Sequence, residues 1–205
     1  MKELQIKTLL VEHLLRQCSD VILGAEVAFQ YGSRRADIIS ITDNNIATAY
    51  EIKGANDSID RLEYQVKSYK SYFDYCYIVC EPCNLSIIRK NIGREVGILV
   101  IHDEFIEHLR KSQRFKQHKK EYLASTLPIK ELRKMTKHNH LRSKHELCEA
   151  LSEEQTTHSI RAQSRKSLAS KYRVQTSLLK RDVATKVTAD DLLTISRSSP
   201  DDLKL

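Results

Sequence analysis

The stretch from Ile46 to Lys53 is apolar enough to form a buried β-strand, yet it ends with the two charged residues Glu51 and Lys53. A neighbouring apolar run, from Arg34 to Thr42, carries a lone acid, Asp37. Charges in such strands are costly unless an opposite charge, hydrogen bonds or a bound cation compensates them. Two adjacent strands that each keep a charge therefore predict a shared polar site within a sheet.

The hydrophobic pattern around these strands predicts an α/β fold. Apolar residues recur at helical spacing between Leu4 and Leu15, and again between Ile59 and Phe73, where Asp57 and Ser58 supply a helix cap. Strands are expected at residues 21–31, 34–42, 46–53, 76–80 and 97–102, with a short helix at 85–92. The order of helix, three strands with tight connections, helix and strand predicts a mixed central sheet flanked by helices.

From Glu104 onward the sequence becomes polar and predominantly helical. Helices are expected over residues 105–115, from Pro128, over 145–151 and over 160–174, followed by a loose tail from about Ser196. We therefore expect a core of residues 1–103 and an all-α extension of residues 104–205. The core has 12 Lys+Arg against 14 Asp+Glu, a net −2, whereas the extension has 22 against 13, a net +9. This basic extension suits DNA phosphates, and a solvated helical surface explains it equally well.

Composition limits the location of the protein. No apolar run approaches the roughly 20 residues that a membrane-spanning helix needs, so we expect no membrane contact. Five cysteines form no regular disulfide framework, which fits a soluble protein in the reducing cytoplasm. Cys80 and Cys83 have a spacing that zinc sites use, but no second Cys or His pair lies nearby in the sequence, so we interpret them as small apolar residues at a strand end.

The charged strand residues can be combined into one site. Side chains alternate along a strand, so Glu51 and Lys53 share a face that Asp37 can reach from the adjoining hairpin strand. The two carboxylates and the backbone carbonyl of Ile52 would offer Mg²⁺ three oxygen ligands. Lys53 would lie beside a metal-bound water, where it could orient the water, help its deprotonation or stabilise negative charge on a phosphate.

The following helix adds a polar stripe, because Arg61, Gln65 and Tyr69 recur at intervals of four residues. If this helix packs near the end of the third strand, the stripe offers a cation, an amide and a hydroxyl to a phosphate. The alternative is structural: Tyr69 packs, Arg61 pairs with Asp57, and Gln65 is solvated. For Tyr69 alone the packing interpretation is preferred.

Taken together, Glu26, Asp37, Glu51-Ile52-Lys53 and Gln65-x-x-x-Tyr69 resemble the pattern of the PD-(D/E)XK nuclease superfamily. The resemblance covers roughly residues 1–102, with Ala36 where the name-giving proline would stand. It implies a restriction-endonuclease-like core and hydrolysis of DNA phosphodiester bonds, as an endonuclease, with Mg²⁺ or its substitute Mn²⁺. More narrowly, Arg35-Ala36-Asp37 and Asp57-Ser58-x-x-Arg61 resemble a group of small bacterial and phage-borne nucleases with a helical C-terminal extension, whose roles would lie in repair, recombination or phage defence.

The resemblance also implies roles for individual residues. Asp37 and Glu51 would be metal ligands, Lys53 and Gln65 would act in catalysis, and Arg35, Arg61 and Tyr69 would contact the substrate. A second metal would need a further acid, for which Glu26 and Glu12 compete. The rival hypothesis is a catalytically silent nucleic-acid-binding or assembly module. A protein partner of the C-terminal helices and a homodimer both remain open.

Overall fold

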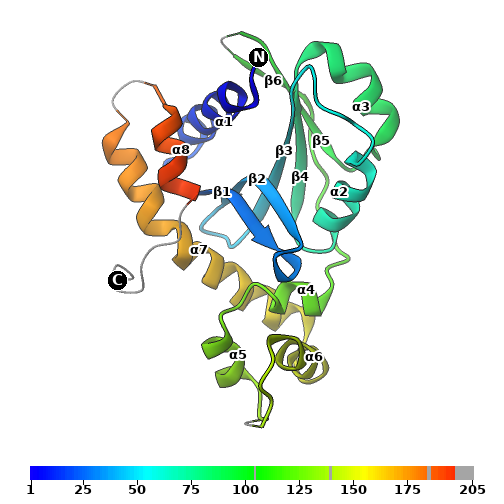
Figure 1. The fold of residues 1–205 in the computed structure, drawn as a ribbon, viewed down its shortest axis with the longest axis vertical. Helices are drawn as coiled ribbons and strands as arrows, with labels where there is room; N and C mark the ends of the chain where they lie inside the picture. Colours follow the sequence, from blue (N-terminus) through cyan, green and yellow to red (C-terminus); the bar gives the residue numbers. More distant parts are fainter. Residues whose placement is uncertain (104, 139, 184–185, 197–205) are drawn as a thin grey trace.

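A six-stranded mixed sheet forms the centre of the structure, a computed structural model that describes residues 1–103, 105–138, 140–183 and 186–196. The strands lie side by side in chain order (Figure 1). They are β1 (Ile22–Phe29), β2 (Arg34–Ile41), β3 (Ala47–Lys53), β4 (Tyr75–Cys80), β5 (Gly97–Ile101) and β6 (Ile106–Arg110). The first three run antiparallel, β3 to β5 run parallel, and β6 is antiparallel to β5. The predicted mixed α/β class is therefore confirmed.

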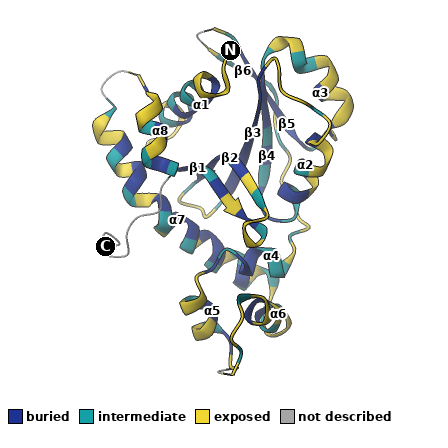
Figure 2. Ribbon diagram, viewed as in Figure 1, coloured by how far each residue is buried: buried dark blue, intermediate teal, exposed yellow. Residues whose placement is uncertain are grey.

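Helices lie on both faces of the sheet, and each face has its own apolar core. They are α1 (Glu3–Gln17), α2 (Leu62–Lys70), α3 (Leu85–Asn91), α4 (Lys120–Ala124), α5 (Ile129–Met135), α6 (Lys144–Glu154), α7 (Thr157–Asp182) and α8 (Ala189–Ser196). One core joins α1 and α8 to Tyr50 and Ile52, whereas the other joins α2 and α7 to Ala47 and Ala49. Successive side chains of β3 thus enter opposite cores, as a pleated strand requires, and the whole strand is buried (Figure 2).

Two sequence-based boundaries in the first half need correction or refinement. The helix expected from Asp57 begins at Leu62, because the Asp57 carboxylate instead accepts a hydrogen bond of 2.7 Å from the backbone N–H of Gly54. The strand expected to run to Tyr31 ends at Phe29, because Gln30, Tyr31 and Gly32 all adopt positive φ in the turn that follows it. The other strands of the core and α1 begin and end within a few residues of their predicted positions.

The helix expected over residues 105–115 is wrong. Residues Ile106–Arg110 form the edge strand β6, which pairs antiparallel with β5 through a short turn closed by the His102 N–H and the Phe105 carbonyl. Pairing with the open edge of β5 satisfies the backbone N–H and C=O groups of this short segment, which lacks helix-capping residues. Strand pairing therefore outweighs the helical spacing of its apolar residues. The helix expected over 160–174 is the middle of the longer α7, and α4 and α8 were not predicted.

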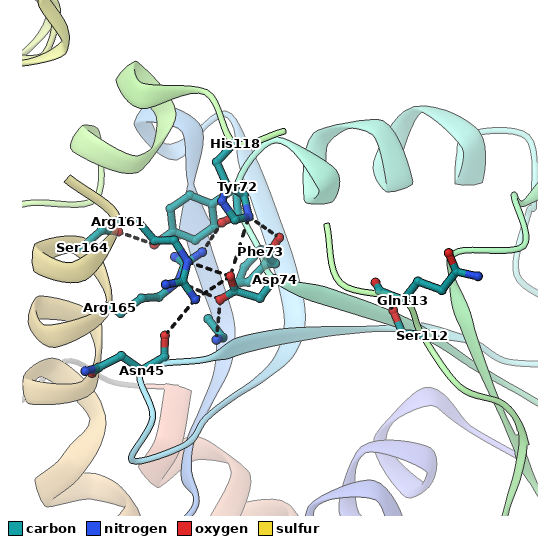
Figure 3. A network of polar contacts seen from close by, with 11 residues as sticks. Asn45, Tyr72, Phe73, Asp74, Ser112, Gln113, His118, Arg161, Ser164 and Arg165 are labelled. Carbon is teal, nitrogen blue, oxygen red and sulfur yellow. Dashed lines mark hydrogen bonds and ion pairs between the residues drawn. The ribbon is translucent and has the colours of Figure 1, made fainter. Parts of the chain in front are cut away.

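A buried ion-pair network attaches α7 to the start of β4 (Figure 3). Asp74 is 0% exposed, accepts a hydrogen bond of 2.9 Å from the Ala47 N–H, and pairs with Arg161 at 2.7 Å and Arg165 at 3.3 Å. Arg165 is also 0% exposed and donates to the Tyr72 carbonyl. Burial by itself would raise the pKa of Asp74, but both arginines and the Ala47 N–H outweigh it and hold that pKa below its usual value.

The second half of the chain lies against the sheet built by the first. Strand β6 extends the sheet, and both α7 and α8 contact β1. The division into a core of residues 1–103 and an extension of residues 104–205 stays a prediction, and the expected loose tail lies outside the described residues from residue 197 onward. Within the described residues, no helix combines the length and apolar character needed to cross a membrane.

Candidate metal-dependent active site

The site begins where β2 and β3 separate. Their paired register ends at Ile38 and Tyr50, and beyond that pair the Asp37 carboxylate accepts a hydrogen bond of 2.8 Å from the Ile52 N–H. The side chain thus takes the place of a backbone acceptor, since a strand leaving its neighbour would otherwise expose an unpaired N–H. The separation lies beside Glu51, whose side chain is on the face that α2 covers.

Glu51 and Lys53 lie together on β3, as their alternate spacing predicted. Their side chains form an ion pair of 3.0 Å, and the two residues are only 3% and 8% exposed. Both are flanked by buried strand neighbours, so their positions are fixed by the sheet rather than by a loop. A carboxylate and an ammonium group are thereby held in low-dielectric surroundings, where their electrostatic effect on a bound group is strong.

Helix α2 directs two polar side chains at Glu51. The Gln65 amide donates to Oε1 of Glu51 at 2.5 Å, and the Tyr69 hydroxyl donates to Oε2. Tyr69 is 1% exposed, so it lies behind Glu51 and does not reach a surface that a substrate would use, contrary to its predicted role in substrate binding. Burial and the neighbouring Glu51 charge raise the pKa of Tyr69, which keeps its hydroxyl protonated as a donor. Gln65 and Tyr69 together orient the Glu51 carboxylate.

Glu26 and Asp37 lie between the register pairs Ala25–Ile38 and Val27–Ala36 of β1 and β2, and Glu26 has an unusual backbone conformation. Its φ of 52° is in the left-handed region, although its neighbours are extended strand residues. Such a conformation costs of order 1–3 kcal/mol for a non-glycine residue and is found most often at functional sites. Its carboxylate pairs with Lys7 and lies 3.5 Å from Arg35. The predicted extra acid therefore lies beside Asp37.

Two residues of α1 complete the site and were missed by the sequence interpretation. Oxygen atoms of Glu3, Glu26 and Asp37 lie within 4.8 Å of one another, and Lys7 pairs with both Glu3 and Glu26. The sequence signal that could have identified Lys7 is a lysine among the apolar residues of an amphipathic helix. In the structure Lys7 is only 9% exposed. Glu12, the competing acid, lies elsewhere: it pairs with Arg16 and accepts a hydrogen bond from the Val187 N–H.

The cluster has more negative charge than its basic groups neutralise. Burial and the neighbouring Glu51 charge raise the pKa of Asp37 to about 7, despite its hydrogen bond from Ile52 and the positive charge of Lys7. Burial lowers the pKa of Lys7, but its hydrogen bonds to Glu26 and Glu3 outweigh this effect and raise it overall. Carboxylate oxygens with unneutralised charge are the donor set that a hard divalent cation prefers, so the residues fit Mg²⁺.

Asp37→Asn is expected to stabilise the metal-free protein by about 1–2 kcal/mol at pH 8, because it removes this charge repulsion and keeps an acceptor for the Ile52 N–H. The folded protein holds the Asp37 proton more tightly than the unfolded chain, whose pKa is near 3.8. Wild-type stability should therefore decrease as pH rises from about 4 to about 7, and the variant should lack that decrease. Urea unfolding in EDTA at pH 5 and pH 8 measures both curves. Parallel curves for the two proteins would contradict the assignment.

The two arginines predicted to contact substrate lie at the surface of the site. The Arg35 side chain is 65% exposed beside Glu26, and its backbone carbonyl lies 3.2 Å from the Tyr69 hydroxyl. Arg61 is exposed at the N-cap of α2, one turn before Gln65. Both residues are therefore accessible to solvent, and their role in substrate binding stays a prediction.

Comparison with known proteins relates the sequence of this chain to a bacteriophage protein. The family model of bacteriophage P4 protein cII matches residues 1–196. Protein cII of Enterobacteria phage P4 is 35% identical over 101 residues, which is 48% of this chain and 38% of the length of the phage protein. A protein of unknown function from Silicibacter pomeroyi shares 13% identity with a TM-score of 0.45, over 90% of this chain and 97% of the other.

Proposed function

The chain belongs to the bacteriophage P4 protein cII family, and for this member we propose a function as a Mg²⁺-dependent nuclease that hydrolyses phosphodiester bonds of DNA. The family name states no activity, so the proposal rests on the site. The observation that carries it is the buried Glu51–Lys53 pair beside Asp37 at the point where β2 and β3 separate. This arrangement resembles the PD-(D/E)XK pattern. The matched part of the phage relative is a minority of that protein, so substrate and partners are proposals here.

Asp37 and Glu51 would hold the metal, together with the backbone carbonyl of Ile52. Mg²⁺ bound there would polarise a phosphate oxygen and lower the pKa of a bound water. Gln65 and Tyr69 hold the Glu51 carboxylate in one orientation. If Oε1 of Glu51 held the metal, its contacts with Gln65 and Lys53 would have to weaken, whereas the Tyr69 hydroxyl could keep its hydrogen bond to Oε2.

Lys53 is the group suited to act on the attacking water or on the developing phosphate charge. Its ammonium lies 3.0 Å from Oε1 of Glu51 and would be available to a new partner if that oxygen held a cation. Glu26 and Glu3 lie next to Asp37 and would bind a second cation only in competition with Lys7. A cation at Asp37 alone would also offset the burial and the neighbouring Glu51 charge that raise the pKa of Asp37.

DNA binding would use basic residues of the second half of the chain. Along the outer side of α7, exposed Lys166, Arg173 and Arg181 line a hollow of about 440 Å³ with the turn residue Asn45. Cationic side chains in a row suit DNA phosphates, and such binding weakens steeply as salt rises. Binding of a protein by the C-terminal helices and formation of a homodimer stay predictions.

The purified chain is expected to cleave plasmid DNA in Mg²⁺ or Mn²⁺ and to lose this activity in EDTA. Plasmid and single-stranded DNA, incubated at low and moderate salt and resolved on agarose gels, provide the assay. Retention of DNA on a filter, measured in parallel, separates binding from cleavage. Tight binding without cleavage in every metal would contradict the nuclease and support the catalytically silent DNA-binding module.

A further inference from the structure

Three side chains converge between α1 and β6, away from the carboxylate cluster. His13 and Gln17 are one turn apart on α1, and His108 reaches them from the edge strand. The Nε2 atoms of the two histidines are 3.0 Å apart. The terminal amide nitrogen of Gln17 lies 2.8 Å from the His13 Nε2 and 3.0 Å from the His108 Nε2. The three atoms form a nearly equilateral triangle.

Hydrogen bonds cannot satisfy all three sides of this triangle. If the Gln17 amide donates to both rings, neither Nε2 carries a proton, so the two rings cannot form a hydrogen bond with each other. If one ring has a proton on Nε2, that atom can no longer accept from Gln17. Rotating the amide by 180° puts its oxygen at the corner, but two ring N–H groups then face each other. In each arrangement at most two of the three contacts are hydrogen bonds.

A transition-metal cation satisfies all three groups at once. With the amide oxygen and two unprotonated nitrogens as ligands, a cation about 2.1 Å from each would bind them at mutual angles of roughly 90°. That is one triangular face of an octahedron, which leaves three positions for water. We propose that His13, Gln17 and His108 form a binding site for an imidazole-preferring divalent cation such as Zn²⁺ or Ni²⁺.

The surroundings of the triad let a cation reach it and favour unprotonated histidine rings. The triad is accessible to solvent, and Gln17 and His108 also line a hollow of about 290 Å³. Burial lowers the pKa of His108, and burial, His108 and Arg16 lower that of His13, which favours the neutral rings that a metal requires. Because the ligands come from α1 and β6, the bound cation would fasten the first helix to the edge of the sheet.

Isothermal titration of the full chain with Zn²⁺ and with Ni²⁺ tests the site. With excess Mg²⁺ present to occupy the carboxylate site, one equivalent is expected to bind and to raise the melting temperature. His13→Ala and His108→Ala should each weaken binding about a hundredfold, and Gln17→Leu about tenfold. His102→Ala is the matched control, because His102 directly follows β5 and pairs with Glu107 at 3.3 Å, away from the triad; this variant should bind the metal normally. Melting curves in EDTA verify that each variant is folded.

The outcome of this titration does not depend on the proposed nuclease activity. A protein with Glu51→Gln should keep the Zn²⁺ site even if no DNA is cleaved. Absence of saturable binding by the wild-type chain would overturn the proposal, as would unchanged binding in both histidine variants. Unchanged binding in Gln17→Leu would overturn the three-ligand arrangement.

Discussion

Replacing Lys53 with methionine is expected to slow Mg²⁺-dependent DNA cleavage by roughly 10²–10⁴-fold and to leave DNA binding intact. Methionine keeps an unbranched apolar stem of similar length and removes the ammonium group 3.0 Å from Glu51. The Glu51 carboxylate retains its hydrogen bonds from Gln65 and Tyr69, so the strand should hold its structure. Single-turnover cleavage of a labelled duplex and filter binding measure the two effects.

Lys70→Met provides the matched control, since Lys70 is also an ion-paired lysine but lies at the end of α2 beside Glu95. Its cleavage rate should stay close to that of the wild type. A second variant, Glu51→Gln, removes the proposed metal ligand and should abolish the response to Mg²⁺. Equal rates for wild type and Lys53→Met, or equal losses in Lys53→Met and Lys70→Met, would contradict a catalytic role for Lys53.

Asp74→Ala is expected to lower the free energy of unfolding by about 3–5 kcal/mol, because it leaves Arg165 buried without its counter-charge. Arg165 is 0% exposed, and its remaining contact is with the Tyr72 carbonyl and ring (Figure 3). Since a domain is stable by only about 5–15 kcal/mol, the loss should be a large part of the total. Urea unfolding at pH 7 measures it.

Asp182→Ala removes a surface partner of Arg181 on the same helix and should cost less than about 1 kcal/mol. The Asp74 contribution also depends on pH. Its folded pKa lies below the unfolded value of 3.8, so the stabilisation is present above about pH 4 and is lost as pH falls through the lower folded pKa. Similar small losses in the Asp74 and Asp182 variants would show that the buried network is not the main attachment of α7.

The first half of the fold was readable because local signals agreed there. Turn residues separate β1, β2 and β3, and the apolar spacing of α1 and α2 is helical, so the order of these elements along the chain followed from the sequence. In the second half, β6 has no strong strand signal of its own and forms because β5 has an open edge. Long-range pairing of this kind cannot be read from residues 106–110 alone.

The candidate site shows the same division. Charged residues in apolar strands identified Asp37, Glu51 and Lys53, and the four-residue interval identified Gln65, because these signals lie within single elements. Lys7 and Glu3 were missed because their relation to Glu26 depends on how α1 crosses the ends of the strands. The positive φ of Glu26 was equally invisible, since glutamate has no preference for that conformation.

By itself, then, the sequence determined the class of fold and the charged residues that a sheet would have to accommodate. The tertiary structure alone decided which neighbours those charges have. It placed Tyr69 behind Glu51, Lys7 between Glu3 and Glu26, and α7 on Asp74. The physical reason is that periodicity and turn chemistry act over a few residues, whereas burial of a charge is compensated by groups brought together from distant parts of the chain.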